Sequence, residues 1–395
     1  MTSALKSGLV VAFAASLTLV LTAQQAFRPI AGAQTTASTL GRAPLVPPGP
    51  LKSPLTIIGA IAVPPFLSSI DIMWVDQMRG RLYIADRSNA GIDIIDAVTN
   101  AYVGRVPGFI ASSSGGLGNA GPNGVLVTPE NILWAGDSDS TLQVVDLNRT
   151  PPQIIKSILI GKSADGRADE LAYDPFERVI LIANDFSTPP RVTFVSADSY
   201  TILGQILFPD ADGMEQPVWD TQLHSFIINV PGRVAYEAII DPVSMKVTKT
   251  LPIPDCPAFG GAGVNGLALG PFQHLLVSAC GNAYIMSATD GSIITKITQA
   301  GGGDEVWYNE GDGQYYLVPF GATAAGAATL GVVDAATNTW QQNVPAQRLR
   351  NLAAYAGNNH IFSVATRPPV GGADPTPCAS FGIIGTGCVV VFGHN

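Results

Sequence analysis

The chain has 395 residues, of which 42 are glycine, 30 are proline and only 13% are charged. Together with a positive mean hydropathy, this composition is typical of a compact, turn-rich all-β protein. The formal net charge of −9 argues against nucleic acid and anionic membranes as partners and is compatible with cations and neutral small molecules.

Residues 1–33 have the pattern of a secretory signal peptide. Lys6 precedes the apolar run GLVVAFAASLTLVLTA, and Ala31 and Ala33 satisfy the small-residue rule for cleavage. We therefore expect cleavage after Ala33, a secreted or periplasmic protein and no membrane span in the mature chain; an uncleaved anchor is the alternative. Residues 34–53, rich in Pro, Ser and Thr, are predicted to be a linker.

Residues 54–395 repeat one unit seven times. Each unit opens with an acidic residue or Asn, followed by an apolar strand, a tight turn and further strands, such as RLYIAD, GIDIID and AYVGRV in the first unit. The openings recur every 40 to 52 residues, which is the length of one β-propeller blade. They are Asp71, Asn123, Glu170, Glu215, Asn265, Glu305 and Asn351.

The seventh unit has only three strands before the sequence ends. The segment PLTIIGAIAV (Pro54–Val63) supplies the missing outer strand, which closes the ring and removes the open sheet edge. The sequence therefore predicts an all-β fold, a seven-bladed β-propeller of four-stranded blades closed by an N-terminal strand. We expect this domain, residues 54–395, to be a monomer.

The repeat also carries a family resemblance. The stretch RLYIADRSNAGIDIIDAVTNAYVGRVPG resembles the YVTN-type propeller repeat, with its YVA second strand and VID third strand. The resemblance covers nearly the whole predicted mature chain and implies the propeller fold. It implies no single function, because this repeat serves surface proteins, binding modules and enzymes alike.

The four cysteines contain no C-x-x-C pair. In an oxidising compartment two disulfides are expected rather than a metal site. Cys256 lies in the predicted loop entering the fifth unit, and Cys280 ends the second strand of that unit. Cys378 and Cys388 both lie in the long connection of the seventh unit. We therefore expect the disulfides Cys256–Cys280 and Cys378–Cys388, bracing long loops around the channel mouth.

The seven opening residues should converge at one end of the central channel, because the inner strands all enter from one face. Four carboxylates at close quarters need a counter-charge or a shared proton. Ca²⁺ favours an oxygen-only set of Asp, Glu and Asn ligands, so the ring predicts a divalent cation, most readily Ca²⁺. The alternative is a wet channel in which these side chains only bind water and neighbouring amides.

A second resemblance concerns this ring. EQPVWD (Glu215–Asp220) is similar to the Glu-x-Pro-x-Trp signature of SMP-30/gluconolactonase-type propellers, and PNGV at Asn123 and VNGL at Asn265 resemble that family's Asn-Gly strands. The resemblance implies a divalent metal that polarises an ester or lactone carbonyl. It implies Glu215, Asn123 and Asn265 as ligands, with Asp304 or Glu305 of GGGDEVW as the base. The motifs stand in a different order along this chain than in the family.

Asp71 and Asn351 complete the predicted metal ligands, and Glu170, Glu215 and Glu305 are the candidates for a glutamate that takes a proton from water. One predicted function is a metal-dependent hydrolase of a small ester or lactone bound at the channel mouth. The other is a non-catalytic binding or surface-associated propeller with a structural cation. A lyase or isomerase that uses the same metal is a third possibility.

Two sets of side chains are predicted to be structural. His224, His274 and His360 begin second strands, so they should lie at the opposite face of the propeller from the ring. Trp74, Trp219 and Trp307 fall on inner strands and are expected to pack between blades rather than form a substrate platform.

Overall fold

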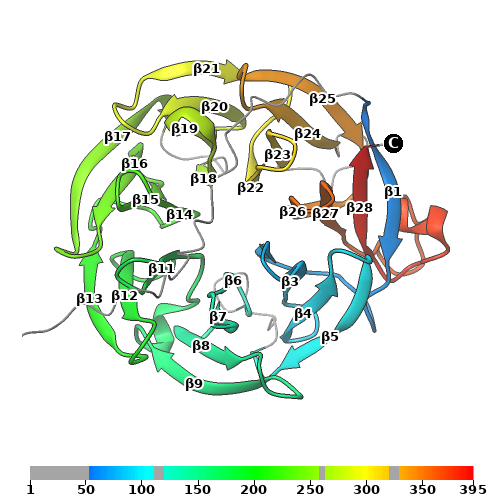
Figure 1. Cartoon of the computed structure of the whole chain (residues 1–395), viewed down its shortest axis with the longest axis horizontal. Coiled ribbons are helices and arrows are strands. Elements are labelled where there is room, and N and C mark those ends of the chain that lie inside the picture. Colours follow the sequence, from blue (N-terminus) through cyan, green and yellow to red (C-terminus); the bar gives the residue numbers. More distant parts are fainter. Residues whose placement is uncertain (1–52, 111–119, 258–262, 320–328, 395) are drawn as a thin grey trace, which may run out of the picture. The chain divides into compact units, whose positions relative to one another are not determined.

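The structure is a computed structural model that describes residues 53–110, 120–257, 263–319 and 329–394. The predicted signal peptide and residues 34–52 of the predicted linker lie outside the described residues. Within residues 46–395 the strands form seven four-stranded antiparallel sheets arranged as the blades of a propeller (Figure 1). The predicted all-β, seven-bladed architecture is confirmed.

Blades 1 to 3 each place their strands in chain order from the channel outward. Blade 1 comprises β2 (Met73–Asp76), β3 (Arg81–Asp86), β4 (Gly91–Asp96) and β5 (Ala101–Pro107). Blade 2 comprises β6 (Val125–Val127), β7 (Ile132–Gly136), β8 (Thr141–Asp146) and β9 (Gln153–Leu159). Blade 3 comprises β10 (Leu171–Asp174), β11 (Val179–Asn184), β12 (Arg191–Ser196) and β13 (Ile202–Leu207).

Blades 4 to 6 follow the same order. Blade 4 comprises β14 (Pro217–Asp220), β15 (Ser225–Val230), β16 (Val234–Asp241) and β17 (Lys246–Pro257). Blade 5 comprises β18 (Val264–Leu269), β19 (His274–Ala279), β20 (Asn282–Ser287) and β21 (Ile293–Ile297). Blade 6 comprises β22 (Gly303–Asn309), β23 (Gln314–Pro319), β24 (Thr329–Asp334) and β25 (Thr339–Pro345).

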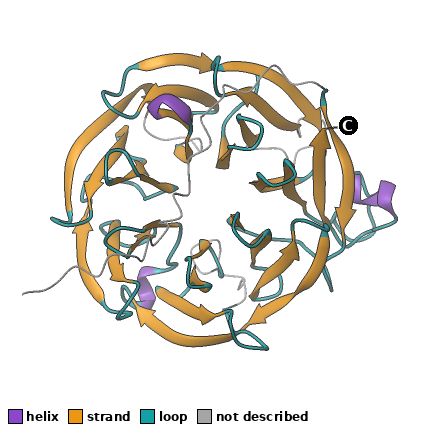
Figure 2. Ribbon diagram, in the orientation of Figure 1, coloured by secondary structure: helices purple, strands orange, loops and turns teal. Residues whose placement is uncertain are grey.

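Blade 7 closes the ring with strands from both ends of the sequence. It comprises β26 (Leu349–Tyr355), β27 (His360–Ala365), β28 (Cys388–His394) and, outermost, β1 (Leu55–Ile61), which pairs antiparallel with β28. The predicted N-terminal closing strand is therefore confirmed. Figure 2 shows few helices; those in the described part of the chain are the short 3₁₀ helices η2 (Ser163–Asp165), η3 (Pro271–Gln273) and η4 (Pro377–Phe381).

Burial explains the strand sequences. The second strands are mostly apolar and almost fully buried, as in VILIAN of β11, because both of their faces pack against neighbouring blades. The outer strands alternate, as in ILGQIL of β13, because only one of their faces is covered. The core is accordingly spread between blades: buried Trp134 of blade 2, for example, packs in one cluster with Ile180 and Ile182 of blade 3.

The predicted structural residues lie where expected. Trp74, Trp219 and Trp307 are half-buried and pack against inter-blade clusters. His274 and His360 begin β19 and β27, and His224 directly precedes β15.

Both predicted disulfides are present, Cys256–Cys280 and Cys378–Cys388. The expected loop at Cys256 is wrong, however, because β17 continues to Pro257, which pairs with Val234 of β16. Cys378 belongs to η4, which packs against β1 and β28 at the outer edge of blade 7 (Figure 1). This second disulfide therefore braces the outer edge of the blade and not the channel mouth.

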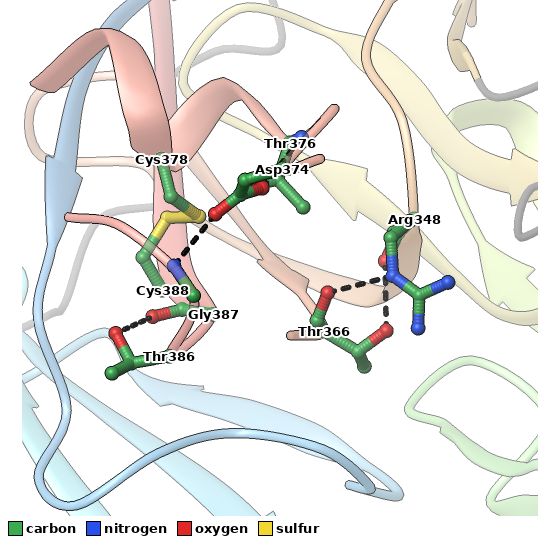
Figure 3. The surroundings of a disulfide bond; sticks show 9 residues. Arg348, Thr366, Asp374, Thr376, Cys378, Thr386, Gly387 and Cys388 are labelled. Atoms are coloured by element: carbon green, nitrogen blue, oxygen red, sulfur yellow. Dashed lines mark hydrogen bonds between the residues drawn. A yellow bond between two sulfur atoms is a disulfide. The ribbon is translucent and has the colours of Figure 1, made fainter. Parts of the chain in front are cut away.

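The loop that carries the second disulfide is ordered by its own side chains. In Figure 3 the Cys378–Cys388 bridge lies beside Asp374, whose carboxylate accepts hydrogen bonds from Thr376 N at 2.9 Å and Gly385 N at 2.8 Å. Arg348 Nε donates to the carbonyl oxygen of Thr366 at 2.9 Å in the same view.

Candidate functional site

Each inner strand begins with a bulge, in which two of its residues stand opposite one residue of the second strand. In blade 1, for example, Asp71 N donates to Ala85 O at 2.9 Å while Ala85 N donates to Ile72 O at 3.0 Å. Blades 5, 6 and 7 show the bulge as a register shift at the corresponding residues. The pairing that follows the bulge fixes which positions of the seven repeats are equivalent.

We call the first bulge residues the mouth ring and the second ones the inner layer. The mouth ring consists of Asp71, Asn123, Asp169, Glu215, Asn265, Asp304 and Asn351. The inner layer consists of Ile72, Gly124, Glu170, Gln216, Gly266, Glu305 and Leu352. Every mouth-ring residue is Asp, Glu or Asn, as predicted.

The register corrects two members of the predicted ring. Glu170 and Glu305 were expected in the ring, but their blades place Asp169 and Asp304 there. The two glutamates lie one residue further along and line a different cavity, deeper in the channel. In both blades two acidic residues are adjacent in sequence, so the pattern alone cannot distinguish them.

On one side of the mouth, arginines compensate the ring. Arg87, which follows β3, forms an ion pair with Asp71, and its Nε donates to Asn123 Oδ1 at 3.0 Å. The Asn123 amide donates in turn to Ala168 O at 2.9 Å. Arg87, Asp71 and Asn123 are all buried. Two predicted metal ligands, Asp71 and Asn123, are thus engaged by an arginine that the sequence did not indicate.

A second arginine extends this compensated side. Arg167 Nη2 lies 2.7 Å from Asp169 Oδ2 and 3.1 Å from Asp185 Oδ2, while Nη1 lies 3.9 Å from Asp71 Oδ2. The guanidinium also sits over the ring of Phe186, 4.8 Å from its centroid. Burial opposes the charge of Arg167, but Asp169, Asp71 and Asp185 outweigh it and raise its pKa.

On the other side of the mouth the ring is open. Glu215, Asn265 and Asp304, from blades 4, 5 and 6, line a cavity of about 800 Å³ whose other residues include Arg167 and Asp185. The side-chain oxygen of Asn265 is buried and has no hydrogen-bond partner. Asp304 Oδ2 accepts one long hydrogen bond, 3.4 Å from Asn351 Nδ2. Three oxygen-bearing side chains therefore face one cavity without an arginine bound to them.

The carboxyl groups of the open side hold their protons unusually tightly. Burial, followed by Asp185 and Asp304, raises the pKa of Glu215 well above its usual range. Burial and the nearby Asp71 likewise raise the pKa of Asp304. A positive charge in the cavity would stabilise both ionised forms.

The full predicted metal-ligand set does not come together. Among the described residues, no three His, Cys, Asp or Glu side chains form a group that could hold a metal ion. Asp71 and Asn123 bind Arg87, and the Asn351 amide donates to Asp71 O at 3.0 Å. Glu215 and Asn265 do share a cavity, and Asp304 joins them. A mixed set of carboxylate and amide oxygens of this kind suits a hard cation.

The Asn-Gly pairs have a steric reason of their own. A Cβ on Gly124 would lie 2.2 Å from Asp169 O, and one on Gly266 would lie 2.8 Å from Val306 Cγ1. Glycine at these inner-layer positions lets neighbouring inner strands approach closely, whether or not the preceding asparagine binds a metal.

The inner layer braces the channel. The Glu305 carboxylate accepts a hydrogen bond from Met73 N at 3.1 Å, and Gln216 Oε1 accepts from Leu267 N at 2.7 Å and Val306 N at 3.2 Å. Each side chain therefore binds main-chain amides of other inner strands. Glu305, a candidate base in the sequence, is buried in this arrangement, away from the mouth cavity.

Comparison with known proteins gives the fold and no family. No family model and no curated protein matches the sequence. A chain of the crystal structure of the mitotic checkpoint complex is similar with a TM-score of 0.60 and 11% identity, over 89% of this chain and 95% of that one. A chain of Kuenenia stuttgartiensis hydrazine synthase is similar with a TM-score of 0.61 and 13% identity, over 75% of this chain and 92% of that one.

At such identities the likeness supports the propeller fold alone. The YVTN-type and SMP-30-type resemblances therefore remain predictions. No helix in the described part of the chain is long and apolar enough to cross a membrane.

Proposed function

We propose that the open side of the mouth ring binds a divalent cation, most readily Ca²⁺, and that the protein is an exported ligand-binding propeller. One observation carries the proposal: the Asn265 side-chain oxygen is buried without a partner in the cavity lined by the Glu215 and Asp304 carboxyls. An unpartnered buried carbonyl oxygen is costly unless a donor or cation satisfies it. The two disulfides support export, because such bonds are typical of oxidising compartments.

The test combines metal analysis of the purified protein with thermal unfolding in Ca²⁺ and in EDTA. We expect Ca²⁺ at about one equivalent and a higher melting temperature in Ca²⁺ than in EDTA. Glu215→Gln should remove this difference, whereas Glu310→Gln, at an exposed position, should retain it. If wild-type protein melts at the same temperature in Ca²⁺ and EDTA and carries no metal, the proposed site is wrong.

Hydrolysis of a small ester or lactone is a second, finer proposal for the same cavity. It is favoured by the pKa of Glu215, which burial and then Asp185 and Asp304 raise, because a carboxylate with a raised pKa is a stronger base toward water. A divalent cation, when bound, would polarise the substrate carbonyl. In this chain one of the two carboxylates, Glu215 or Asp304, would take the proton from the attacking water. The other would remain as a polar group in the wall of the substrate cavity.

Turnover of a panel of lactones and aryl esters separates the two proposals. Hydrolysis that Glu215→Gln abolishes, with the fold retained by circular dichroism, would support the enzyme. Ca²⁺ binding without turnover of any ester would leave a non-catalytic binding propeller. Export is tested separately: the secreted protein should begin at Gln34 by mass spectrometry.

A further inference from the structure

Below the mouth, the central channel contains a second cavity of about 360 Å³. Aromatic side chains from four inner strands line it: Trp74, Tyr173, Trp219, Trp307 and Tyr308. All five are half-buried and line the cavity, and the ring of Trp219, for example, also packs between blades. This volume falls within the range of small-molecule sites.

Glu170 adds a carboxylate to the aromatic wall. It is only 4% exposed and lines this cavity, and its Oε2 atom has no hydrogen-bond partner. Glu305, in the same inner layer, is by contrast bonded to a main-chain amide, that of Met73.

The sequence explains why Glu170 is left unpaired. Met73, whose N–H binds Glu305, is the residue directly after the inner-layer residue of its own blade. In the blade next to Glu170 this position is Pro217, which has no N–H to donate. One blade further, the amide of Leu267 already donates to Gln216 at 2.7 Å. Among the described residues, these positions of the neighbouring strands therefore offer Glu170 no free amide, which leaves its Oε2 atom without a donor.

A second buried polar atom without a partner belongs to another residue that lines this cavity. Trp219 lines the cavity, and its indole Nε1 is buried without an acceptor. A ligand with a positively charged group for Glu170 and an acceptor oxygen for Trp219 would satisfy both atoms. The faces of the surrounding tryptophans and tyrosines would attract the same positive charge through cation–π interactions.

We propose that the lower channel is a binding site for a small organic cation, a substituted ammonium group with a nearby hydroxyl or ether oxygen. This site is separate from the mouth cavity, because the two share no lining residue. The two sites have different lining residues, although the charge of Glu170 is influenced by Glu215 and Asp304 of the mouth cavity. Inorganic anions are disfavoured by Glu170 and Glu305, which both line the cavity.

Choline and its uncharged isostere 3,3-dimethylbutan-1-ol test the proposal, because they have the same shape and hydroxyl group but differ in charge. Binding is followed by titration calorimetry and by tryptophan fluorescence, since three of the five tryptophans line the cavity. We expect choline to bind and the isostere to bind at least about tenfold more weakly.

Two variants place the ligand in the channel. Glu170→Gln should weaken choline binding by about tenfold, while leaving the isostere unchanged. Trp307→Phe keeps an aromatic ring for packing and should weaken choline by a smaller factor, because tryptophan is the best cation–π partner. The exposed Glu310→Gln variant should bind choline as the wild type does, and near-ultraviolet circular dichroism should show that all three fold.

Three results would overturn the proposal. Equal affinity of wild-type protein for choline and the isostere would show that charge is not recognised. Failure of both compounds to bind would show that the channel is not a site for this class of ligand. Unchanged choline affinity in folded Glu170→Gln would place binding elsewhere.

Discussion

The same position of the repeat has different roles on the two sides of the mouth ring. On the side of blades 1 to 3, Asp71, Asn123 and Asp169 are buried against Arg87 and Arg167. On the side of blades 4 to 6, Glu215, Asn265 and Asp304 line a cavity and include an oxygen without a partner. A polar ring in a propeller channel is therefore not one site: its compensated side is structural, and its open side is available to a ligand.

The largest loss of stability is expected on removing an arginine from the compensated side of the ring. Arg87→Met would leave Asp71 buried without its ion-pair partner and Asn123 Oδ1 without its donor. We expect a loss of about 3–5 kcal/mol in the free energy of unfolding, measured by denaturant titration. Arg149→Met is the control, because its pair with Asp146 is solvent-exposed and its loss should change stability little. Equal losses in the two variants would remove the distinction between the two sides.

The second-largest loss of stability is expected on removing the disulfide near the open side. Replacing Cys256 and Cys280 by Ala should cost about 2–4 kcal/mol of unfolding free energy. It should also reduce the Ca²⁺-dependent rise in melting temperature, because Cys280 N donates to Gly263 O at 3.2 Å beside the mouth cavity.

Replacing Cys378 and Cys388 by Ala provides the matched comparison for that variant. The disulfide closes a shorter segment at the outer edge of blade 7, so it should lower stability without changing the response to Ca²⁺. A Ca²⁺ response that falls equally in both double variants would indicate a general loss of stability rather than a local effect.

The open side should also determine much of the pH dependence of stability. The pKa of Glu215 is raised in the folded chain, so between its usual value and the raised one the native state binds more protons than the unfolded state. Stability should therefore fall as pH rises above the usual range of a glutamate carboxyl. Asp93, whose pKa burial and Asp86 raise to about 8, contributes in the same direction.

Unfolding free energies across this pH range, for wild type and Glu215→Gln, provide the measurement. The variant should show a shallower slope that does not vanish, since Asp93 and Asp304 still titrate. An unchanged slope would mean that Glu215 ionises normally in the folded protein.

The smallest effect on stability is expected at Asn265. Its side-chain oxygen makes no hydrogen bond, so Asn265→Leu should change the unfolding free energy by no more than about 1 kcal/mol. The same variant should lose the stabilisation by Ca²⁺. A large destabilisation in EDTA would show that Asn265 has a structural role like that of Asn123.

Much of the architecture can be predicted from the sequence because the same unit recurs seven times. Blade number, strand order, ring closure and both disulfides follow from the spacing of polar openings and apolar strands. The sequence does not identify which residue belongs to the mouth ring at Asp169-Glu170 and Asp304-Glu305. There a shift of one residue turns a different side chain toward the mouth, and only pairing with the second strand resolves it.

The two arginines escaped sequence reasoning for a different reason. Arg87 and Arg167 lie in loops outside the repeating strands, and a charged residue in a loop is usually interpreted as solvent-exposed. Their position was the available signal: Arg87 follows the end of a second strand, and Arg167 precedes an inner strand, so both belong to the connections at the channel mouth. Their burial also depends on side chains from other blades, because Arg87 donates to Asn123 of blade 2 and Arg167 lies 3.9 Å from Asp71 of blade 1.

The pairing of β1 with β28 has a consequence for the order of folding. Blade 7 needs Leu55 and His394, near opposite ends of the sequence, to become partners. During synthesis the early blades can form while β1 still waits, with its edge unpaired, for a strand that emerges last. Pairing across so long a separation raises the contact order of the fold, and the unpaired edge can associate with other chains until the seam closes.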